Sequence, residues 1–394
     1  MGAIPNARLA MQSISFDTII VGAGPAGLGC ALALRQAGVE RLLLLERAEI
    51  GSSFAAWPRE MRMITPSFHG NPLLQTDLNA INPDSSPADL LGREHPSGSE
   101  YAAYLKAVAR HYALPVCRQE SVLSVLPEEN GFSVETSRRA LNAKTVIWAG
   151  GEFVHPRKSE FPGADLCRHN STIASWDQVE GDEAIIIGGY ESGIDAAHHL
   201  VQRGKQVTVI SRGEPWLADH PDPSESLSPY TKERLLHILQ DHPGQLNLKA
   251  HTEVSGVSKS EEHYHVVTTD SECLKTKAPP ILATGFRSAL TPIRHLFEWD
   301  GPVPLFTEND ASTRHEGLFY SGPSLIQRDS KFCFIYKFRA RFGVIARTIA
   351  EQLGLASPSF ADYARKGFLM DDLDCCIDCK CAPERKPSNA LDAR

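Results

Sequence analysis

Short apolar runs of strand length recur along the chain, and glycines follow each of them closely. The runs FDTIIV at 16–21 and LLLL at 42–45 flank a segment, 28–38, that has the small apolar spacing of a buried helix. The same succession recurs between residues 183 and 212. Continuous apolar strands that alternate with helices are typical of parallel sheets covered on both faces. The pattern therefore predicts an α/β fold whose unit is used twice.

Each unit also carries an antiparallel excursion before its last strand. Residues 121–136 alternate around an Asn-Gly turn, as a hairpin does, and the second unit has comparable strands over 246–276. The chain then continues through a buried strand at 317–322 and a helix from about Phe338 to Leu353. This order implies that the second unit is inserted into the first.

A glycine-rich turn follows the first apolar strand. Its residues are Gly22, Ala23, Gly24, Pro25, Ala26 and Gly27. In such a turn the first glycine permits the bend, the second lets a pyrophosphate approach the backbone, and the third lets the helix pack on the strand. Glu46, at the end of the next strand, can accept hydrogen bonds from a ribose and repels a 2′-phosphate. This unit should hold FAD or NAD.

An altered copy of the turn follows the strand at 183–187. Its residues are Gly188, Gly189, Tyr190, Glu191, Ser192 and Gly193. The next strand ends at Ser211 and Arg212, and an arginine there can pair with a 2′-phosphate, which favours NADPH over NADH. Tyr190 replaces the middle glycine, so its side chain either displaces the cofactor or swings aside. A degenerate unit that binds nothing tightly is the alternative.

These observations predict two Rossmann-like, three-layer domains, with an NADPH-binding domain inserted into a FAD-binding domain. We expect the FAD-binding domain at 15–155 and 281–356, the NADPH-binding domain at 156–280, and a C-terminal tail at 357–394.

Composition limits the partners and the cellular setting. The chain has 394 residues and a net charge of −8, which argues against binding nucleic acid or an anionic membrane. It has no apolar run long enough for a membrane span and no recognisable secretory signal, and its nine cysteines do not form a secreted disulfide pattern. We expect a cytoplasmic protein that acts on a small molecule; a homodimer is compatible with this organisation.

Four of the nine cysteines crowd together near the end of the chain, at Cys375, Cys376, Cys379 and Cys381. They could relay electrons from a flavin to an outside disulfide, or bind a metal through thiolates, or belong to an exposed tail. Neighbouring acids would raise the pKa of these thiols, which counts against a highly reactive thiolate.

Two further segments have a functional and a structural interpretation. The stretch 331–342 packs five aromatic side chains among lysines and arginines. It could cover a flavin ring and place positive charge beside it, or it could begin an amphipathic helix. His198 and His199 are expected on the surface or in the packing of a helix rather than on a metal.

Taken together, these motifs resemble the two-dinucleotide-binding-domain flavoproteins, which include flavin-containing monooxygenases and thioredoxin-reductase-like enzymes. The resemblance covers about residues 15 to 355 and includes ATGF with Gly285 and EGLFYSG with Gly322. It implies FAD at the Gly22/Glu46 site and NADPH at the Gly188/Arg212 site. The segments RMITPS at 62–67 and HPS to YAAYL at 95–105 look most like the monooxygenase branch.

The chain also departs from these families. Monooxygenases carry F-x-G-x-x-x-H-x-x-x-(W/Y/F) ahead of the second fingerprint; over 166–176 only Trp176 is in register, and His169 is displaced by three positions. The CxxC of thioredoxin reductases is missing from the corresponding positions, and neither Cys30 nor Cys167 forms a dithiol. A branch resembling bacillithiol-disulfide reductases also lacks a CxxC and has a bulky residue at the position of Tyr190.

We therefore expect an NADPH-dependent FAD oxidoreductase. The main prediction is a monooxygenase-like enzyme that oxygenates a small substrate through a C4a-hydroperoxyflavin. The alternative is a reductase of a small thiol or disulfide, for which the C-terminal cysteines could serve as a relay. A flavin- or nucleotide-binding sensor with slow turnover is a third interpretation, for which Tyr190 is the best argument.

Overall fold

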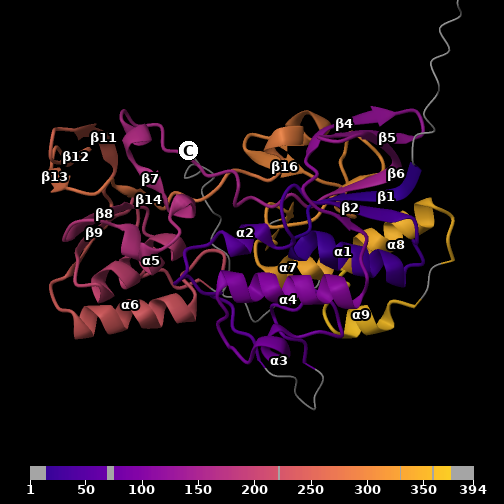
Figure 1. Ribbon diagram of the computed structural model, residues 1–394, viewed down its shortest axis with the longest axis horizontal. Coiled ribbons are helices and arrows are strands. Elements are labelled where there is room, and N and C mark those ends of the chain that lie inside the picture. Colours follow the sequence, from indigo (N-terminus) through magenta and orange to yellow (C-terminus); the bar gives the residue numbers. More distant parts are fainter. Residues whose placement is uncertain (1–14, 69–74, 221, 329, 357–358, 374–394) are drawn as a thin grey trace, which may run out of the picture.

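The computed structural model describes residues 15–68, 75–220, 222–328, 330–356 and 359–373, and Figure 1 shows that they form two lobes side by side. The larger lobe is built on a sheet of order β3-β2-β1-β6-β5-β4, in which β17 also pairs with β6. Its strands are β1 (Ser15–Val21), β2 (Leu42–Leu45), β3 (Val116–Cys117), β4 (Val122–Glu128), β5 (Gly131–Thr136), β6 (Ala140–Trp148) and β17 (Leu318–Tyr320). The β3, β2, β1, β6 and β17 pairings are parallel, and the predicted hairpin β4–β5 joins them antiparallel to β6.

Helices close one face of this sheet (Figure 1). Helix α1 (Pro25–Gln36) and helix α8 (Phe342–Gln352) lie so close that a side chain at Gly29 would overlap the Phe342 ring. The predicted helix at 338–353 is therefore α8, which begins at Phe342 after short turns. The other elements of this lobe are α2 (Ser52–Ala55), α3 (Pro87–Leu91), α4 (Gly98–His111), α7 (Ile335–Phe338), α9 (Ala361–Arg365), β15 (Glu298–Asp300), β16 (Val303–Leu305), β18 (Ile326–Gln327) and β19 (Ser330–Lys331), with 3-10 turns at Thr291–Leu296 and Arg339–Arg341.

The smaller lobe repeats the arrangement with a parallel sheet of order β10-β9-β8-β14-β7. Its strands are β7 (Arg168–His169), β8 (Glu183–Ile187), β9 (Gln206–Ile210), β10 (Leu246–Lys249) and β14 (Ile281–Leu282). On one face lie α5 (Glu191–Gln202) and α6 (Pro229–Asp241), and three 3-10 turns precede β8, at Ala164–Leu166, Asn170–Thr172 and Trp176–Gln178. On the other face the antiparallel sheet β11 (Val254–Lys259), β12 (Tyr264–Thr268) and β13 (Cys273–Thr276) packs on β8 and β9.

The α/β class with parallel sheets is confirmed, and the late strand β17 returns to β6 of the first sheet. Strand β14 begins just beyond the expected domain limit at residue 280, yet it pairs with β7 and β8 of the second sheet. The exact domain limits stay predictions.

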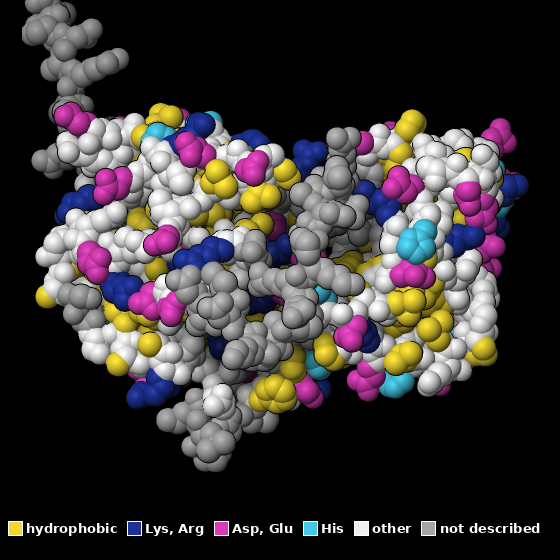
Figure 2. Space-filling view, turned by 180° about the vertical axis from the view of Figure 1, so that it is seen from behind, with side chains coloured by type: hydrophobic (Ala, Val, Ile, Leu, Met, Phe, Trp, Pro, Cys, Tyr) yellow, Lys and Arg dark blue, Asp and Glu magenta, His cyan; other side chains and the backbone are white. Residues whose placement is uncertain are grey.

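Acidic and basic side chains are mixed over both lobes on the face shown in Figure 2. Within the described ranges, no helix combines the length and the apolar character needed to cross a bilayer.

Candidate functional site

A cavity of about 500 Å³ opens between the carboxyl ends of the first sheet and the smaller lobe. Both glycine-rich turns and several loops line it, which is the usual position of ligand sites in open α/β sheets. The lining residues include Gly22, Gly24, Pro25, Ala26, Glu46, Arg62, Asn79, Glu152, Glu191, Ser192, Asp195, Gly322, Cys333, Phe334, Ile335 and Phe338. The expected FAD residues of the first turn are therefore brought together around one space.

The geometry of the first turn matches the roles expected for its glycines. Gly22 has a φ of 106°, and a Cβ there would lie 2.4 Å from the carbonyl oxygen of Ala149. A Cβ on Gly27 would lie 1.9 Å from the carbonyl oxygen of Gly22. Gly24 differs, because the described residues, apart from its chain neighbours and the backbone of its own helix, place no atom within 4 Å of the corresponding Cβ position. The space above Gly24, at the N-terminus of α1, therefore fits a pyrophosphate.

Glu46 is buried at the end of β2, and its carboxylate is fixed by the backbone. Its Oε2 accepts a hydrogen bond of 2.9 Å from the Ala23 N–H, and its Oε1 accepts one of 2.9 Å from the Ala48 N–H. Oε1 also accepts a hydrogen bond of 3.4 Å from Ser52 Oγ, whereas the described residues leave a second lone pair of Oε2 available. The carboxylate is therefore anchored beside the cavity and can still accept hydrogen bonds from a ribose.

The second turn has the same backbone conformation as the first, but a tyrosine side chain replaces the middle glycine. Gly188 has a φ of 114°, and a Cβ on Gly193 would lie 1.9 Å from the Gly188 carbonyl oxygen. Tyr190 has φ −91° and ψ −165°, close to the −87° and −169° of Gly24. Its hydroxyl donates a hydrogen bond of 3.1 Å to the Ser224 carbonyl. The side chain thus swings aside to the 222–228 loop, and Ser192 lines the cavity.

The other residues predicted to bind NADPH lie near the carboxyl end of β9 and the start of α6. Glu191 is bound to the start of α6, where Thr231 Oγ1 donates to it at 2.5 Å, and burial raises its pKa. Ser211 is buried beyond the end of β9, whereas Arg212 is exposed. Gly189 packs against Trp216, and Gly285 has a φ of 75°. Gly189, Ser211 and Arg212 thus surround the end of β9, and their contacts with NADPH stay predictions.

Two acids that sequence reasoning missed face the cavity. Burial raises the pKa of Glu152, which follows β6, to about 7. Asp195, on the second turn of α5, is almost fully buried; Arg234 donates to its Oδ1 at 2.8 Å, and its Oδ2 accepts no hydrogen bond from the described residues. Burial opposes ionisation of Asp195, but His199 and Arg234 lower its pKa. Perturbed acids in a cleft are functional candidates.

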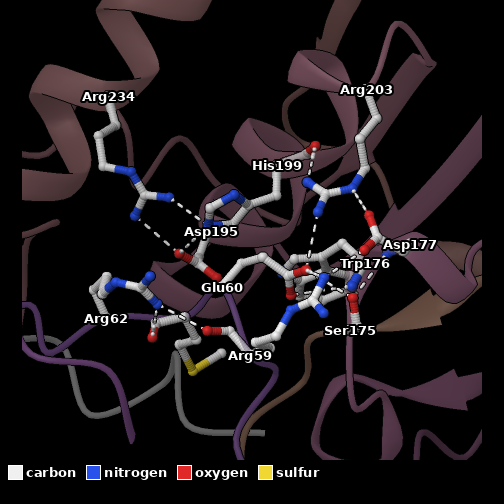
Figure 3. Close-up of polar contacts among 11 residues, drawn as sticks. Arg59, Glu60, Arg62, Ser175, Trp176, Asp177, Asp195, His199, Arg203 and Arg234 are labelled. Atoms are coloured by element: carbon white, nitrogen blue, oxygen red, sulfur yellow. Dashed lines mark hydrogen bonds and ion pairs between the residues drawn. The ribbon is translucent and has the colours of Figure 1, made fainter. Parts of the chain in front are cut away.

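Polar contacts join the two lobes beside the cavity (Figure 3). Glu60, which precedes the cavity-lining Met61–Thr65 stretch, accepts hydrogen bonds from Ser175 Oγ at 2.7 Å and from Arg203 Nη2 at 2.9 Å. Arg203 also donates to Asp177 Oδ1 at 2.7 Å. Because Arg203 follows α5, this cluster ties the C-terminal end of that helix to the larger lobe, while its N-terminal end faces the cavity.

In the stretch 331–342, some apolar side chains line the cavity, and two basic side chains form ion pairs. Phe334, Ile335 and Phe338 line the cavity. Lys337 donates to Asp222 at 2.5 Å, and the fully buried Arg341 pairs with Asp310 at 2.8 Å. These two basic groups are therefore paired with acids.

The remaining candidates lie outside the cavity or outside the described residues. His169 is held through its ring nitrogens by Ser171 Oγ at 2.8 Å and the Gly285 carbonyl at 3.0 Å, and Trp176 is fully buried. His198 is buried and His199 contacts Arg234 at 2.9 Å, so the packing interpretation of both is confirmed. The cluster Cys375, Cys376, Cys379 and Cys381 lies outside the described residues. No metal-ligating group of three was found among the described residues.

Comparisons with known proteins agree with this arrangement. The model of the pyridine nucleotide-disulphide oxidoreductase family matches residues 19–322. Bacilliredoxin reductase Bdr of Bacillus subtilis is 25% identical over 343 residues, which are 86% of this chain and 99% of that protein.

Two solved structures are similar in fold and below 25% identity. The bacillithiol disulfide reductase Bdr (YpdA) from Staphylococcus aureus has a TM-score of 0.71 at 21% identity. A flavin-containing monooxygenase from Stenotrophomonas maltophilia has a TM-score of 0.67 at 18% identity. Each comparison covers 86% of this chain and 99% of the other. They establish the fold.

Proposed function

Because the chain belongs to the pyridine nucleotide-disulphide oxidoreductase family, we propose that it is an NADPH-dependent flavoprotein reductase of a low-molecular-weight disulfide. It is an oxidoreductase that uses FAD and NAD(P)H, as this family does. Similarity to bacilliredoxin reductase Bdr along nearly the whole of that protein supports the reductase proposal, and the name of the similar bacillithiol disulfide reductase makes bacillithiol disulfide the first substrate to test.

The observation that carries the proposal is that residues of both glycine-rich turns line one shared cavity. Gly24 and Glu46 belong to the first unit and Ser192 to the second, and all line the same space. The first unit, with Gly24 and Glu46, would hold FAD, which would supply hydride transfer from NADPH and onward reduction of an acceptor. The protein's part is to hold the two cofactors at the ends of α1 and α5 and to admit the acceptor between the lobes.

His169 favours a reductase over an oxygenase. Its two ring nitrogens are occupied by Ser171 and by the Gly285 carbonyl, and burial lowers its pKa. The imidazole is therefore engaged within the smaller lobe instead of serving the cavity. The monooxygenase expectation has the structural likeness to a flavin-containing monooxygenase in its favour and stays a prediction.

Cys333 is the one cysteine of the described residues that lines the cavity. Burial raises its pKa, so a neutral thiol is expected there. We therefore propose that the disulfide accepts electrons at the flavin itself, without a dithiol relay in the described part of the chain. The relay through Cys375–Cys381 stays a separate prediction.

The test is NADPH oxidation by the purified holoenzyme under strictly anaerobic conditions, with bacillithiol disulfide and cystine as acceptors. Stoichiometric thiol formation that survives Cys379→Ser supports direct reduction, whereas loss of turnover in that variant supports the relay. Turnover that requires oxygen and yields an oxygenated product would contradict the reductase assignment.

A further inference from the structure

The side chain of Tyr190 begins where the first glycine-rich turn keeps open space. Tyr190 has nearly the same φ and ψ as Gly24, and the Cβ position of Gly24 faces open space among the described residues. The Cβ of Tyr190 therefore points into the corresponding space, above the N-terminus of α5. A side chain has three staggered positions about its first torsion angle. The position that the ring takes decides whether a nucleotide phosphate can approach this turn.

One hydrogen bond fixes the direction of the ring. The Tyr190 hydroxyl donates to the Ser224 carbonyl at 3.1 Å. Burial raises the pKa of this hydroxyl to about 12, so it keeps its proton and can donate at neutral pH. The ring is half-buried and packs against the core of the smaller lobe. A phenylalanine ring has the same shape but would lack the hydrogen bond.

The larger lobe holds the loop that carries Ser224. Lys337 Nζ donates to Asp222 Oδ1 at 2.5 Å and to Ser224 Oγ at 2.8 Å. Asp222 Oδ1 also accepts from the Ser224 N–H at 2.8 Å, and Ser224 Oγ lies 3.1 Å from Cys333 Sγ. Lys337 and Cys333 belong to the stretch 331–342, which contributes to the cavity wall. This stretch of the larger lobe therefore fixes the carbonyl that receives the tyrosine hydrogen bond.

We infer that the hydrogen bond from Tyr190 to Ser224 keeps the nucleotide site of the second turn open, and that Lys337 sustains this bond from the larger lobe. With the bond made, the space above the N-terminus of α5 is free for a phosphate. Without it, the ring also occupies the other staggered positions, and a molecule whose ring fills the space cannot bind the nucleotide. The apparent affinity then falls with the fraction of open molecules.

Both Tyr190 and Lys337 are positioning residues in this account. The inference rests on NADPH binding at the second turn, and it holds whichever acceptor receives the electrons. It also gives the tyrosine at the middle position a function that glycine lacks, because it makes nucleotide binding depend on contact between the lobes.

The first test compares two substitutions of Tyr190 in the holoenzyme. The Kd of NADP⁺, which does not reduce the flavin, is measured by isothermal titration calorimetry. Tyr190→Phe should raise the Kd by about fivefold, because it frees the ring. Tyr190→Gly should bind at least as tightly as the wild type, because no ring remains. If the ring instead contacts the nucleotide, the order is reversed, since phenylalanine keeps the ring and glycine removes it.

The second test asks whether Lys337 acts through Tyr190. Lys337→Met should raise the Kd by about threefold in the wild type and leave it unchanged in Tyr190→Gly. A direct attraction between the lysine and the nucleotide would persist in both backgrounds. Lys331→Met is the matched control, because it removes an equal charge that is paired with Glu225 instead. It should leave the Kd unchanged.

Flavin content and melting temperature verify that each variant folds. The inference is wrong if the wild type and Tyr190→Phe have equal Kd values, or if Tyr190→Gly binds more weakly than Tyr190→Phe. It is also wrong if Lys337→Met has the same effect in both backgrounds. A wild type that binds no NADP⁺ would overturn both the inference and the NADPH site. Failure of the disulfide assay alone contradicts only the proposed reductase activity.

Discussion

The two glycine-rich turns have the same backbone conformation but differ in the side chain at the middle position, which is Gly24 in the first turn and Tyr190 in the second. Gly24 and Tyr190 have nearly identical φ and ψ, both in the extended region that any residue can adopt. Backbone strain therefore does not require glycine at position 24, and we expect glycine there because it leaves space for a ligand. The outer glycines Gly27 and Gly193 meet the same 1.9 Å restriction in both turns. The comparison thus distinguishes Gly27 and Gly193, which the turn itself requires, from Gly24, which we expect to leave room for a cofactor.

The segments that follow β6 and β14, which pack against the two turns, also share their backbone contacts and differ in one side chain. A Cβ on Gly22 would meet the Ala149 carbonyl, and one on Gly188 would meet that of Ala283. Three residues after these alanines the first unit has Glu152 and the second has Phe286, and both line the cavity. The first unit thus adds a titratable group where the second adds an apolar one.

The largest expected effect comes from giving the first turn the side chain of the second. Gly24→Tyr should fold, because the backbone suits tyrosine, but it should fill the space kept open for a pyrophosphate. FAD affinity should fall by about a hundredfold or more. The measurement is flavin absorbance of the purified protein, with circular dichroism as the check of folding. The converse variant Tyr190→Gly should keep its flavin. Full FAD content in Gly24→Tyr would show that the space at Gly24 is not needed for FAD binding.

Because the two turns are built alike, substitutions at Gly27 and Gly193 should destabilise the protein equally. Gly27→Ala and Gly193→Ala each place a methyl group against a backbone carbonyl and should lower the free energy of unfolding by about 2 kcal/mol. Thermal denaturation of the two variants would check this. A clear difference between them would show that one turn adjusts and the other does not.

A smaller effect is expected at the strand end of the second unit. Arg212→Ala should lower the preference for NADPH over NADH by about tenfold, the scale of one charge-assisted phosphate contact. The ratio of kcat/KM for the two nucleotides measures it. Arg47→Ala, next to Glu46 in the first unit, is the matched control and should leave that ratio unchanged. An unaltered ratio in Arg212→Ala would assign 2′-phosphate recognition elsewhere.

The last expected effect depends on pH and concerns Glu152. Its pKa is about 7 in the folded protein and 4.5 ordinarily, so between these values the folded state holds more protons than the unfolded chain. Stability should therefore fall as pH rises from about 5 to about 7. Glu152→Gln should flatten that dependence, which melting temperatures across this range would detect. A slope identical to that of the wild type would place the titration on another group.

Local sequence signals predicted the parts of the site that are contiguous in the chain. The turns at Gly22 and Gly188 and their flanking strands follow from apolar runs and glycine spacing. The direction of the Tyr190 side chain depends on Ser224, and the partner of Glu60 lies 143 positions away at Arg203. The burial of Glu152 arises only when distant segments come together around the cavity. No local pattern distinguishes such residues from ordinary polar positions.

The reductase assignment is tested most directly by reoxidation of the reduced enzyme. The holoenzyme is reduced with one equivalent of NADPH without oxygen and mixed in a stopped-flow instrument with either bacillithiol disulfide or air-saturated buffer. The proposal predicts that the disulfide restores the oxidised flavin spectrum at least about tenfold faster than oxygen does. Rapid reaction with oxygen through a C4a-adduct, with no response to the disulfide, would contradict it and restore the monooxygenase prediction.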